Sequence, residues 1–350
     1  MEILDIDSLE KEYLIIKEDR LKGRWITFKD IESLYSKLPN YIESKIIGTS
    51  EKGTPIYKLK LGRGKKKVFM WSQMHGNEST GTKAVFDFLN FINENSSKSI
   101  IKTILSNIEI HIIPMLNPDG AHAYTRVNAN NIDLNRDAVD LIAKESKLLR
   151  SVLEEINPEF CFNLHDQRTI FGVEGTSNPA TISFLAPSEE ESRQITKGRA
   201  ETMNVIIAMN KLLQQIIPNH VGRYTDEFYP TATGDNFQKL GHNTILIEAG
   251  HYPNDYDREE VRKFNFYALI QGFFHISTNT EFSNYEEYFS IPNNIKNFYD
   301  VIYRSKNNEK DIAYQYAEKI ESNKFVLTLI KEKEGDLKSY LSHQEFNIND

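Results

Sequence analysis

The chain has 350 residues, of which 39% are hydrophobic and 26% are charged, a composition that excludes an intrinsically disordered protein and supports a sizeable core. Its 42 basic and 50 acidic residues give a formal net charge of −8, and because the basic residues are mostly dispersed we expect no nucleic-acid partner. The acidic start, the lack of an apolar run of membrane-spanning length and the single cysteine, Cys161, predict a cytoplasmic protein without a membrane partner.

The N-terminal residues predict helices followed by a hairpin. Residues 1–45 show the spacing of amphipathic helices, and residues 45–62 resemble two strands joined by the turn Glu51-Lys52-Gly53-Thr54. We therefore expect residues 1–40 to form a helical segment that packs on the main domain.

Strands and helices alternate through the middle of the chain. Short apolar runs predict buried strands at residues 68–71, 108–115, 160–164 and 244–247. Helical spacing is found at residues 85–92, 141–156, 190–217 and 258–275. This alternation predicts an α/β sheet in one main domain, residues 41–277.

The sequence changes character after residue 277. Residues 277–294 are rich in Asn, Ser, Thr, Glu and aromatics without clear periodicity, and strand-like stretches follow at residues 298–303 and 325–330. We expect residues 278–350 to form a small C-terminal module, and the sequence assigns it no role.

Four polar side chains follow the predicted strands directly. His75 and Glu78 form an H-x-x-E motif, His165 follows the strand at 160–164, and Glu248 follows the strand at 244–247. Because the carboxyl ends of strands in an open α/β sheet form its ligand-binding edge, these side chains can converge. Two imidazoles and a carboxylate are suitable ligands for a catalytic zinc ion that keeps one position for water. An H-x-x-E motif alone is a weak signal, so these residues argue only for a metal hydrolase.

Further motifs extend this pattern over residues 40–277. They are His75-Gly76-Asn77-Glu78, Asn117-Pro118-Asp119-Gly120, Arg126, Asp133-Leu134-Asn135-Arg136, Asn163-Leu164-His165 and Ile247-Glu248-Ala249-Gly250. With them the chain resembles the zinc carboxypeptidases of the carboxypeptidase A type. The resemblance implies a three-layer α/β/α sandwich around a mixed sheet of about eight strands, with the C-terminal module as an appendage.

The same resemblance implies roles for the residues that carry the chemistry. His75, Glu78 and His165 would bind one zinc ion per chain, and Glu248 would act as general base and then general acid. Arg126 would stabilise the oxyanion that develops on the scissile carbonyl.

Other matched residues concern the substrate. Asn135 and Arg136 would bind the terminal carboxylate of a peptide, which makes the expected partner a peptide with a free C terminus. Asp133 would orient the first zinc histidine. For the tyrosine that closes over the substrate we choose Tyr229, with Tyr224 as the competing choice.

Two alternative functions stay open. A deacylase of N-acyl amino acids, of the aspartoacylase or succinylglutamate desuccinylase kind, shares the H-x-x-E motif and a later histidine. The Asn-Pro-Asp-Gly turn and the long segment after residue 170 favour the peptidase. A non-catalytic zinc-binding or peptide-binding module would not need Glu248. Asp166 and Asp235 are both expected to hold local structure.

Overall fold

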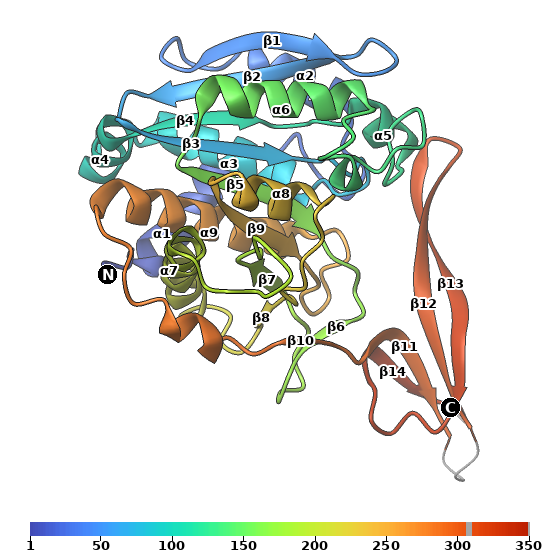
Figure 1. The fold of residues 1–350 in the computed structure, drawn as a ribbon. Coiled ribbons are helices and arrows are strands. Elements are labelled where there is room, and N and C mark those ends of the chain that lie inside the picture. Colours follow the sequence, from blue (N-terminus) through green and yellow to red (C-terminus); the bar gives the residue numbers. More distant parts are fainter. Residues whose placement is uncertain (306–309, 349–350) are drawn as a thin grey trace.

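A mixed eight-stranded sheet forms the centre of the protein in the computed structural model, which describes residues 1–305 and 310–348 (Figure 1). The strand order is β1-β2-β4-β3-β5-β9-β7-β8. The strands are β1 (Glu43–Thr49), β2 (Pro55–Gly62), β3 (Lys66–Ser72), β4 (Ile108–Ile113), β5 (Phe160–Asp166), β7 (Ile182–Leu185), β8 (Val221–Arg223) and β9 (Asn243–Ala249). The central strands β4, β3, β5 and β9 run parallel, whereas β1, β2 and β7 pair antiparallel with their neighbours in the β1-β2-β4 and β9-β7 parts of the sheet.

Helices cover both faces of this sheet. The larger hydrophobic core lies on the face covered by α1 (Ile6–Ile16), α2 (Phe28–Tyr35), α3 (Thr80–Glu94), α4 (Ser99–Asn107), α7 (Lys197–Leu213) and α9 (Glu259–Thr278). The smaller core lies on the other face, under α6 (Lys144–Ile156) and α8 (Thr233–Lys239). Because the sheet is covered on both sides, every residue of β5 is buried, as is usual for parallel strands. The predicted α/β/α sandwich with a mixed sheet is confirmed.

The N-terminal segment is held on α3 and α9 by a buried ion pair. Arg262 donates to both carboxylate oxygens of Asp87 at 2.6 Å, and both side chains are fully buried. Tyr13 of α1 also donates to Asp87 at 3.0 Å, and so does the backbone N–H of Glu18 at 2.8 Å. These bonds position residues 17–27, which run from α1 to the edge of the site.

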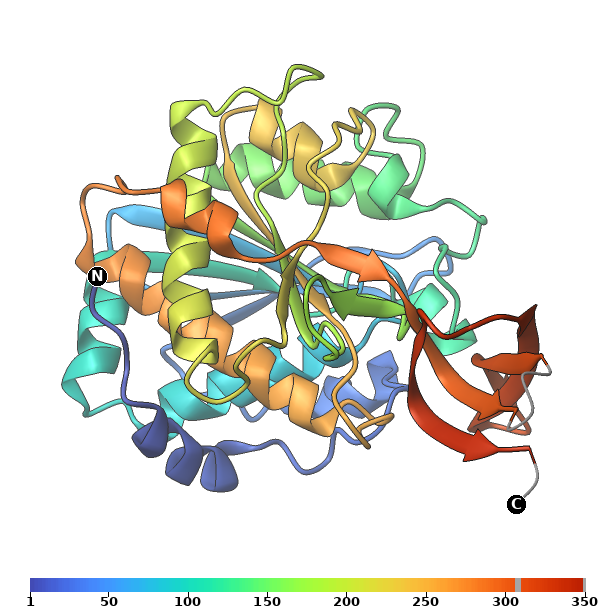
Figure 2. The same ribbon diagram turned by 90° about the horizontal axis from the view of Figure 1, so that it is seen from below.

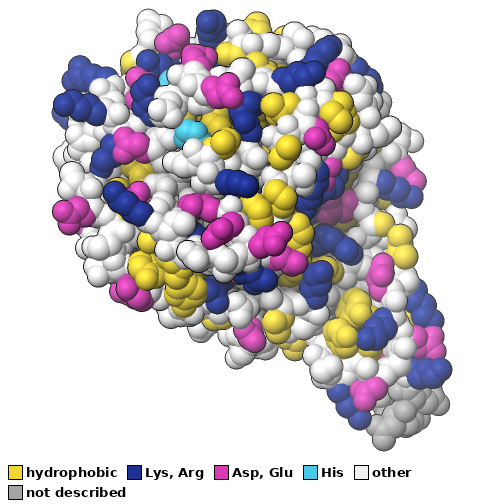
Figure 3. Space-filling view, viewed as in Figure 1, with side chains coloured by type: hydrophobic (Ala, Val, Ile, Leu, Met, Phe, Trp, Pro, Cys, Tyr) yellow, Lys and Arg dark blue, Asp and Glu magenta, His cyan; other side chains and the backbone are white. Residues whose placement is uncertain are grey.

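The C-terminal residues form a second sheet beside the main body (Figures 1 and 2). The chain first forms η2 (Glu286–Ser290) and then β10 (Asn294–Lys296), which pairs with β6 (Phe171–Val173) of the body. We call the following strands the C-terminal sheet: β11 (Phe298–Arg304), β12 (Asp311–Glu321), β13 (Lys324–Gly335) and β14 (Leu341–Asn347). Its long β12–β13 hairpin reaches α5 (Pro118–Ala123) of the body. Basic and acidic side chains are interspersed over the face shown in Figure 3.

Among the described residues, no helix has the length and apolar character needed to cross a bilayer. The cytoplasmic location stays a prediction.

Candidate metal centre and catalytic site

The first two predicted metal ligands lie in the loop between β3 and α3. The backbone of Gln73 turns sharply after β3 with φ 50°, and its buried side chain donates to the carbonyls of Ile26 and Gly76. Gly76 packs directly on the backbone of Gly120, and a Cβ added at Gly76 would lie 1.9 Å from the Gly120 carbonyl carbon. The H-G-N-E loop and the N-P-D-G turn therefore fix each other's position, and this contact places His75.

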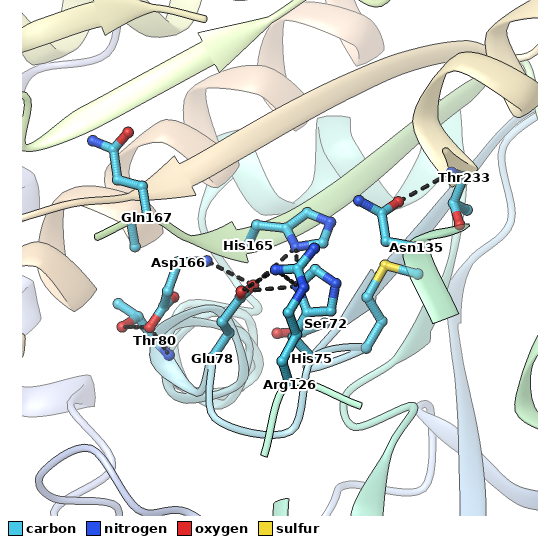
Figure 4. Close-up of polar contacts among 12 residues, drawn as sticks. Ser72, His75, Glu78, Thr80, Arg126, Asn135, His165, Asp166, Gln167 and Thr233 are labelled. Atoms are coloured by element: carbon cyan, nitrogen blue, oxygen red, sulfur yellow. Dashed lines mark hydrogen bonds and ion pairs between the residues drawn. The ribbon is translucent and has the colours of Figure 1, made fainter. Parts of the chain in front are cut away.

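His75, Glu78 and His165 form a buried cluster whose ligand atoms all lie within 4.8 Å of one another (Figure 4). Nδ1 of His75 lies 2.8 Å from Oε1 of Glu78, and Nδ1 of His165 lies 2.9 Å from Oε2 of the same carboxylate. The two Nδ1 atoms are 3.1 Å apart. Two imidazole nitrogens and a carboxylate that face one point are a donor set suited to a zinc ion.

Asp133 contacts the ring nitrogen of His75 that points away from the cluster. Its Oδ1 lies 3.0 Å from Nε2 of His75 and can accept a proton there, which would leave Nδ1 for a metal ion. Burial lowers the pKa of His75, but the charge of Glu78 and the contacts with Asp133 and Glu78 outweigh it, so the pKa is raised when no metal is bound. Burial lowers the pKa of His165, which favours the neutral form that a metal requires. The residues present therefore fit a zinc ion.

Glu248 lies beside the cluster on the neighbouring strand. It pairs in register with His165 across β5 and β9, and both side chains point to the face covered by α6 and α8. The side chain is partly exposed to the cavity. Burial raises its pKa well above the usual value, and the charges of Glu78 and Asp166 add to this effect. A dication on the cluster would oppose the contribution of Glu78.

Two arginines and an asparagine lie beside the cluster. Arg126 donates from Nε to Asp133 at 2.9 Å, and its Nη1 lies 3.5 Å from Glu78. Asn135 accepts a hydrogen bond from the backbone N–H of Thr233 at 3.0 Å, and this leaves its amide nitrogen on the side of the cluster (Figure 4). Arg136 follows Asn135 and is exposed, with no carboxylate partner among the described residues.

The two candidate tyrosines lie in different surroundings. Tyr229 is 45% exposed and donates to Glu227 at 2.9 Å, outside the cavity. Tyr224 lines the cavity, where burial raises its pKa and the charges of Glu248 and Glu78 raise it further. The geometry thus favours Tyr224. Asp235 lies outside the cavity as well and accepts the backbone N–H of Tyr229 at 3.1 Å.

Most of the predicted site residues border one cavity of about 620 Å³, namely His75, Glu78, Arg126, Asn135, Arg136, His165, Tyr224 and Glu248. Its walls also contain residues that the sequence did not assign to a site, namely Arg24, Asn77, Asp166, Gln167, Arg168, Thr169, Ile170, Phe171, Arg258, Lys296, Gln315, Tyr316 and Glu318. No motif contains Arg24 or the three residues of β12. The burial of Arg24, and of Arg258 at the start of α9, is seen only in the structure, so no sequence signal pointed to them.

The structure resembles solved carboxypeptidases over most of its length. The metallo-carboxypeptidase from Burkholderia cenocepacia aligns with a TM-score of 0.55 and 19% identity over 70% of this chain and 67% of that protein. The carboxypeptidase A from Helicoverpa armigera aligns with a TM-score of 0.58 and 15% identity over 78% of this chain and 80% of that protein. At these identities the likeness shows the fold.

Sequence comparison gives weaker but consistent matches. Carboxypeptidase SOL1 of Arabidopsis thaliana is 28% identical over 170 residues, which are 43% of this chain and 35% of that protein. Carboxypeptidase E of Caenorhabditis elegans is 30% identical over 151 residues, 36% of this chain and 32% of that protein. The chain thus spans about a third of the length of these relatives.

The family model for zinc carboxypeptidases matches residues 28–210, more than half of the chain. The matched range contains the three clustered metal donors and ends before Glu248. The resemblance inferred from the motifs is confirmed, and the chain belongs to the zinc carboxypeptidase family.

Proposed function

We propose that the protein is a metallocarboxypeptidase that binds one zinc ion and hydrolyses the last peptide bond of a peptide with a free C-terminal carboxylate. One observation carries this proposal. A single cavity contains the His75–Glu78–His165 cluster, an adjacent carboxylate on Glu248, and an exposed guanidinium on Arg136.

His75, Glu78 and His165 would hold the zinc ion, and Asp133 would keep the His75 ring in the orientation required. When bound there, zinc supplies a Lewis acid and lowers the pKa of a water molecule to about 7.

Glu248 takes the proton of the attacking water and afterwards gives it to the leaving amine. Two observations support this role: Glu248 pairs in register with His165, one of the proposed zinc ligands, and its raised pKa suits a group that must both accept and donate a proton. Arg126 offers N–H donors to the oxygen of the scissile carbonyl, where negative charge develops. Its side chain is 46% exposed, so it can turn towards a substrate without leaving a buried site.

Arg136 and Asn135 bind the substrate carboxylate. A guanidinium can donate two parallel hydrogen bonds to a carboxylate, and the free amide nitrogen of Asn135 adds a third donor. Tyr224 is our choice for the tyrosine that contacts the substrate, because it lines the cavity beside Glu248.

A substrate screen tests this function. Purified protein would be incubated with pairs of peptides that differ only in a free or amidated C terminus, and with N-acyl amino acids, and the products would be identified by mass spectrometry. We expect loss of one C-terminal residue from the free peptides alone, with about one zinc per chain by elemental analysis. Equal cleavage of amidated peptides, or cleavage of N-acyl amino acids alone, would overturn the proposal, and the second result would identify a deacylase.

A further inference from the structure

Arg258 is a buried arginine at the start of α9 that the proposed function does not use. It borders the catalytic cavity, yet only 2% of its surface is exposed. From its position just before the helix, its side chain reaches the carboxyl ends of β5 and β9, which pair with each other in the sheet. The contacts of its guanidinium therefore decide what it does.

This guanidinium joins the ends of the two strands. Nη1 of Arg258 donates to the carbonyl of Ala249, the last residue of β9, at 2.6 Å. Nη2 donates to the carbonyl of Gln167, which follows β5, at 2.5 Å. Nη1 also pairs with Oδ2 of Asp166 at 3.1 Å. The two strand ends are thus held together by a side chain as well as by the hydrogen bonds of the sheet.

Two of the three acceptors are next to side chains of the candidate site. Ala249 follows Glu248, Asp166 follows His165, and these two pairs of residues lie in register across the strands. The backbone N–H of Asp166 also donates to Oε2 of Glu78 at 3.1 Å, so the residue that pairs with the guanidinium contacts a third member of the site. A shift of either strand end would therefore change the distances between the catalytic carboxylate and the metal donors.

The backbone of Arg258 has a conformation that residues other than glycine rarely adopt. Its φ of 54° lies in the left-handed region, which is unfavourable for a residue with a Cβ and is often found at functional sites. Asp255 holds this turn: its carbonyl accepts the N–H of Arg258 at 3.1 Å, and its carboxylate accepts the N–H groups of Glu259 at 2.8 Å and Glu260 at 2.9 Å. These bonds fix the point from which the Arg258 side chain starts.

One turn further along α9, Arg262 makes an equivalent set of contacts away from the cavity. It pairs with buried Asp87 and donates to the carbonyls of Leu21 at 2.5 Å and Glu18 at 3.0 Å. Both arginines thus bond a buried aspartate and two backbone carbonyls, but of the two only Arg258 borders the cavity. Arg262 therefore shows what an arginine of this kind contributes when it only holds the fold.

We propose that Arg258 is a positioning residue whose guanidinium holds the ends of β5 and β9 at a fixed separation and so keeps Glu248 in place beside the metal donors. The proposal rests on the carboxypeptidase function proposed above. A guanidinium suits this task because its donors are spread over a planar fork and can reach separate acceptors, whereas an ammonium carries all its donors on one atom. The site therefore requires the shape of the fork as well as its charge.

Two lysine variants test this role. Arg258→Lys and Arg262→Lys each lose the fork and keep a cation beside the buried aspartate, so neither leaves a buried charge unpaired. We expect Arg258→Lys to lower kcat about 10- to 100-fold, the loss typical for a residue that orients metal ligands. KM should stay unchanged, because Arg258 has no contact with the carboxylate-binding pair. Arg262→Lys should keep the wild-type kcat. Wild-type kcat in Arg258→Lys, or an equal loss in both variants, would overturn the proposal.

Zinc binding gives a readout that does not depend on the reaction. Because Asp166 links the guanidinium to Glu78, Arg258→Lys should raise the dissociation constant for zinc by about tenfold, measured by competition with a chelator. Arg262→Lys should leave it unchanged, and equal constants for the two variants would overturn the proposal. If wild-type protein hydrolyses no peptide, the carboxypeptidase function fails, and the zinc constants alone decide the role of Arg258.

Thermal unfolding of the metal-free variants shows whether each is folded. If a lysine variant does not fold, both members of the ion pair are replaced by neutral residues, with Arg258→Met and Asp166→Asn in one protein and Arg262→Met and Asp87→Asn in the other. The same differences in kcat and in zinc affinity are then expected between the two proteins, and their absence refutes the positioning role.

Discussion

Replacing Asp133 by alanine should weaken zinc binding about tenfold while leaving the fold intact. Asp133 accepts from Nε2 of His75 at 3.0 Å and from Nε of Arg126 at 2.9 Å, so truncation removes the bond that holds the His75 ring and keeps its proton on Nε2. Loss of such a partner typically costs 10- to 100-fold in metal affinity, or about 1.4–2.7 kcal/mol. We expect the lower end, because the Asp133 side chain is 24% exposed and water can replace part of the bond.

Competition with a chelator at neutral pH would give the zinc dissociation constants. Asp140→Ala is the matched control, because it removes an exposed carboxylate from the same segment without touching the cluster. Thermal unfolding of the metal-free proteins would show whether the fold is unchanged. An Asp133→Ala protein that binds zinc as tightly as the control would refute the idea that Asp133 selects Nδ1 of His75 as the ligand.

Three further outcomes follow from the site. Glu248→Gln should lower kcat by about 10²- to 10⁴-fold and retain zinc, measured by steady-state kinetics and elemental analysis; normal turnover would exclude Glu248 as the base. Arg136→Ala should lower kcat/KM about 10- to 150-fold on peptides with a free C terminus, because it removes about 1.5–3 kcal/mol of charge-assisted hydrogen bonding. An unchanged kcat/KM would mean that the substrate carboxylate binds elsewhere. Burial raises the pKa of Asp235 to about 6, so between about pH 4 and 6 the native carboxyl keeps a proton that the unfolded chain has lost, and stability falls as pH rises through that window. Asp235→Asn should therefore stabilise the protein at pH 7 by on the order of 2–3 kcal/mol relative to pH 4, measured by urea unfolding at both pH values; a gain independent of pH would contradict this.

The sequence predicted the sheet and the metal cluster because both depend on local patterns. The run at residues 68–71 is entirely apolar, and the run at 160–164 is interrupted only by Asn163, because β3 and β5 are covered on both faces. Such runs are easy to recognise in a sequence. His165 follows the second run directly and His75 lies in the loop after the first, so the topology of a parallel sheet brings them to one edge.

The C-terminal sheet was harder to predict for a physical reason. Most of β13 and β14 is exposed or only partly buried, so their residues lack the contrast between a buried and a polar face that marks a strand. The sequence predicted strands at residues 298–303 and 325–330, within β11 and β13, and missed β12 and β14. In β12 the buried positions are Asp311, Ala313 and Gln315, which are polar or small, so its alternation in burial is not an alternation in hydrophobicity. The contact of Glu318 with Arg24 joins residues that are 294 positions apart in the sequence, and no local sequence pattern predicts it.

The choice between Tyr229 and Tyr224 could not be made from spacing. The two residues are five positions apart in a stretch that belongs to neither a helix nor a strand between β8 and α8. No helical or strand periodicity therefore fixes the directions in which the two side chains point. Tertiary contacts set each direction, such as the hydrogen bond between Tyr229 and Glu227.

Because β12 lines the cavity, a shortened recombinant protein that lacks the C-terminal sheet would also lack part of the cavity wall. A recombinant fragment cut at the limits of the motif-bearing region, residues 41–277, would lose both Arg24 and Glu318, and with them two sides of the cavity. Tyr124 would also lose its hydrogen bond to Glu318. Such a fragment could retain the metal cluster and still select its substrates differently. The specificity measured for it would then depend on where the chain was cut as well as on the catalytic residues.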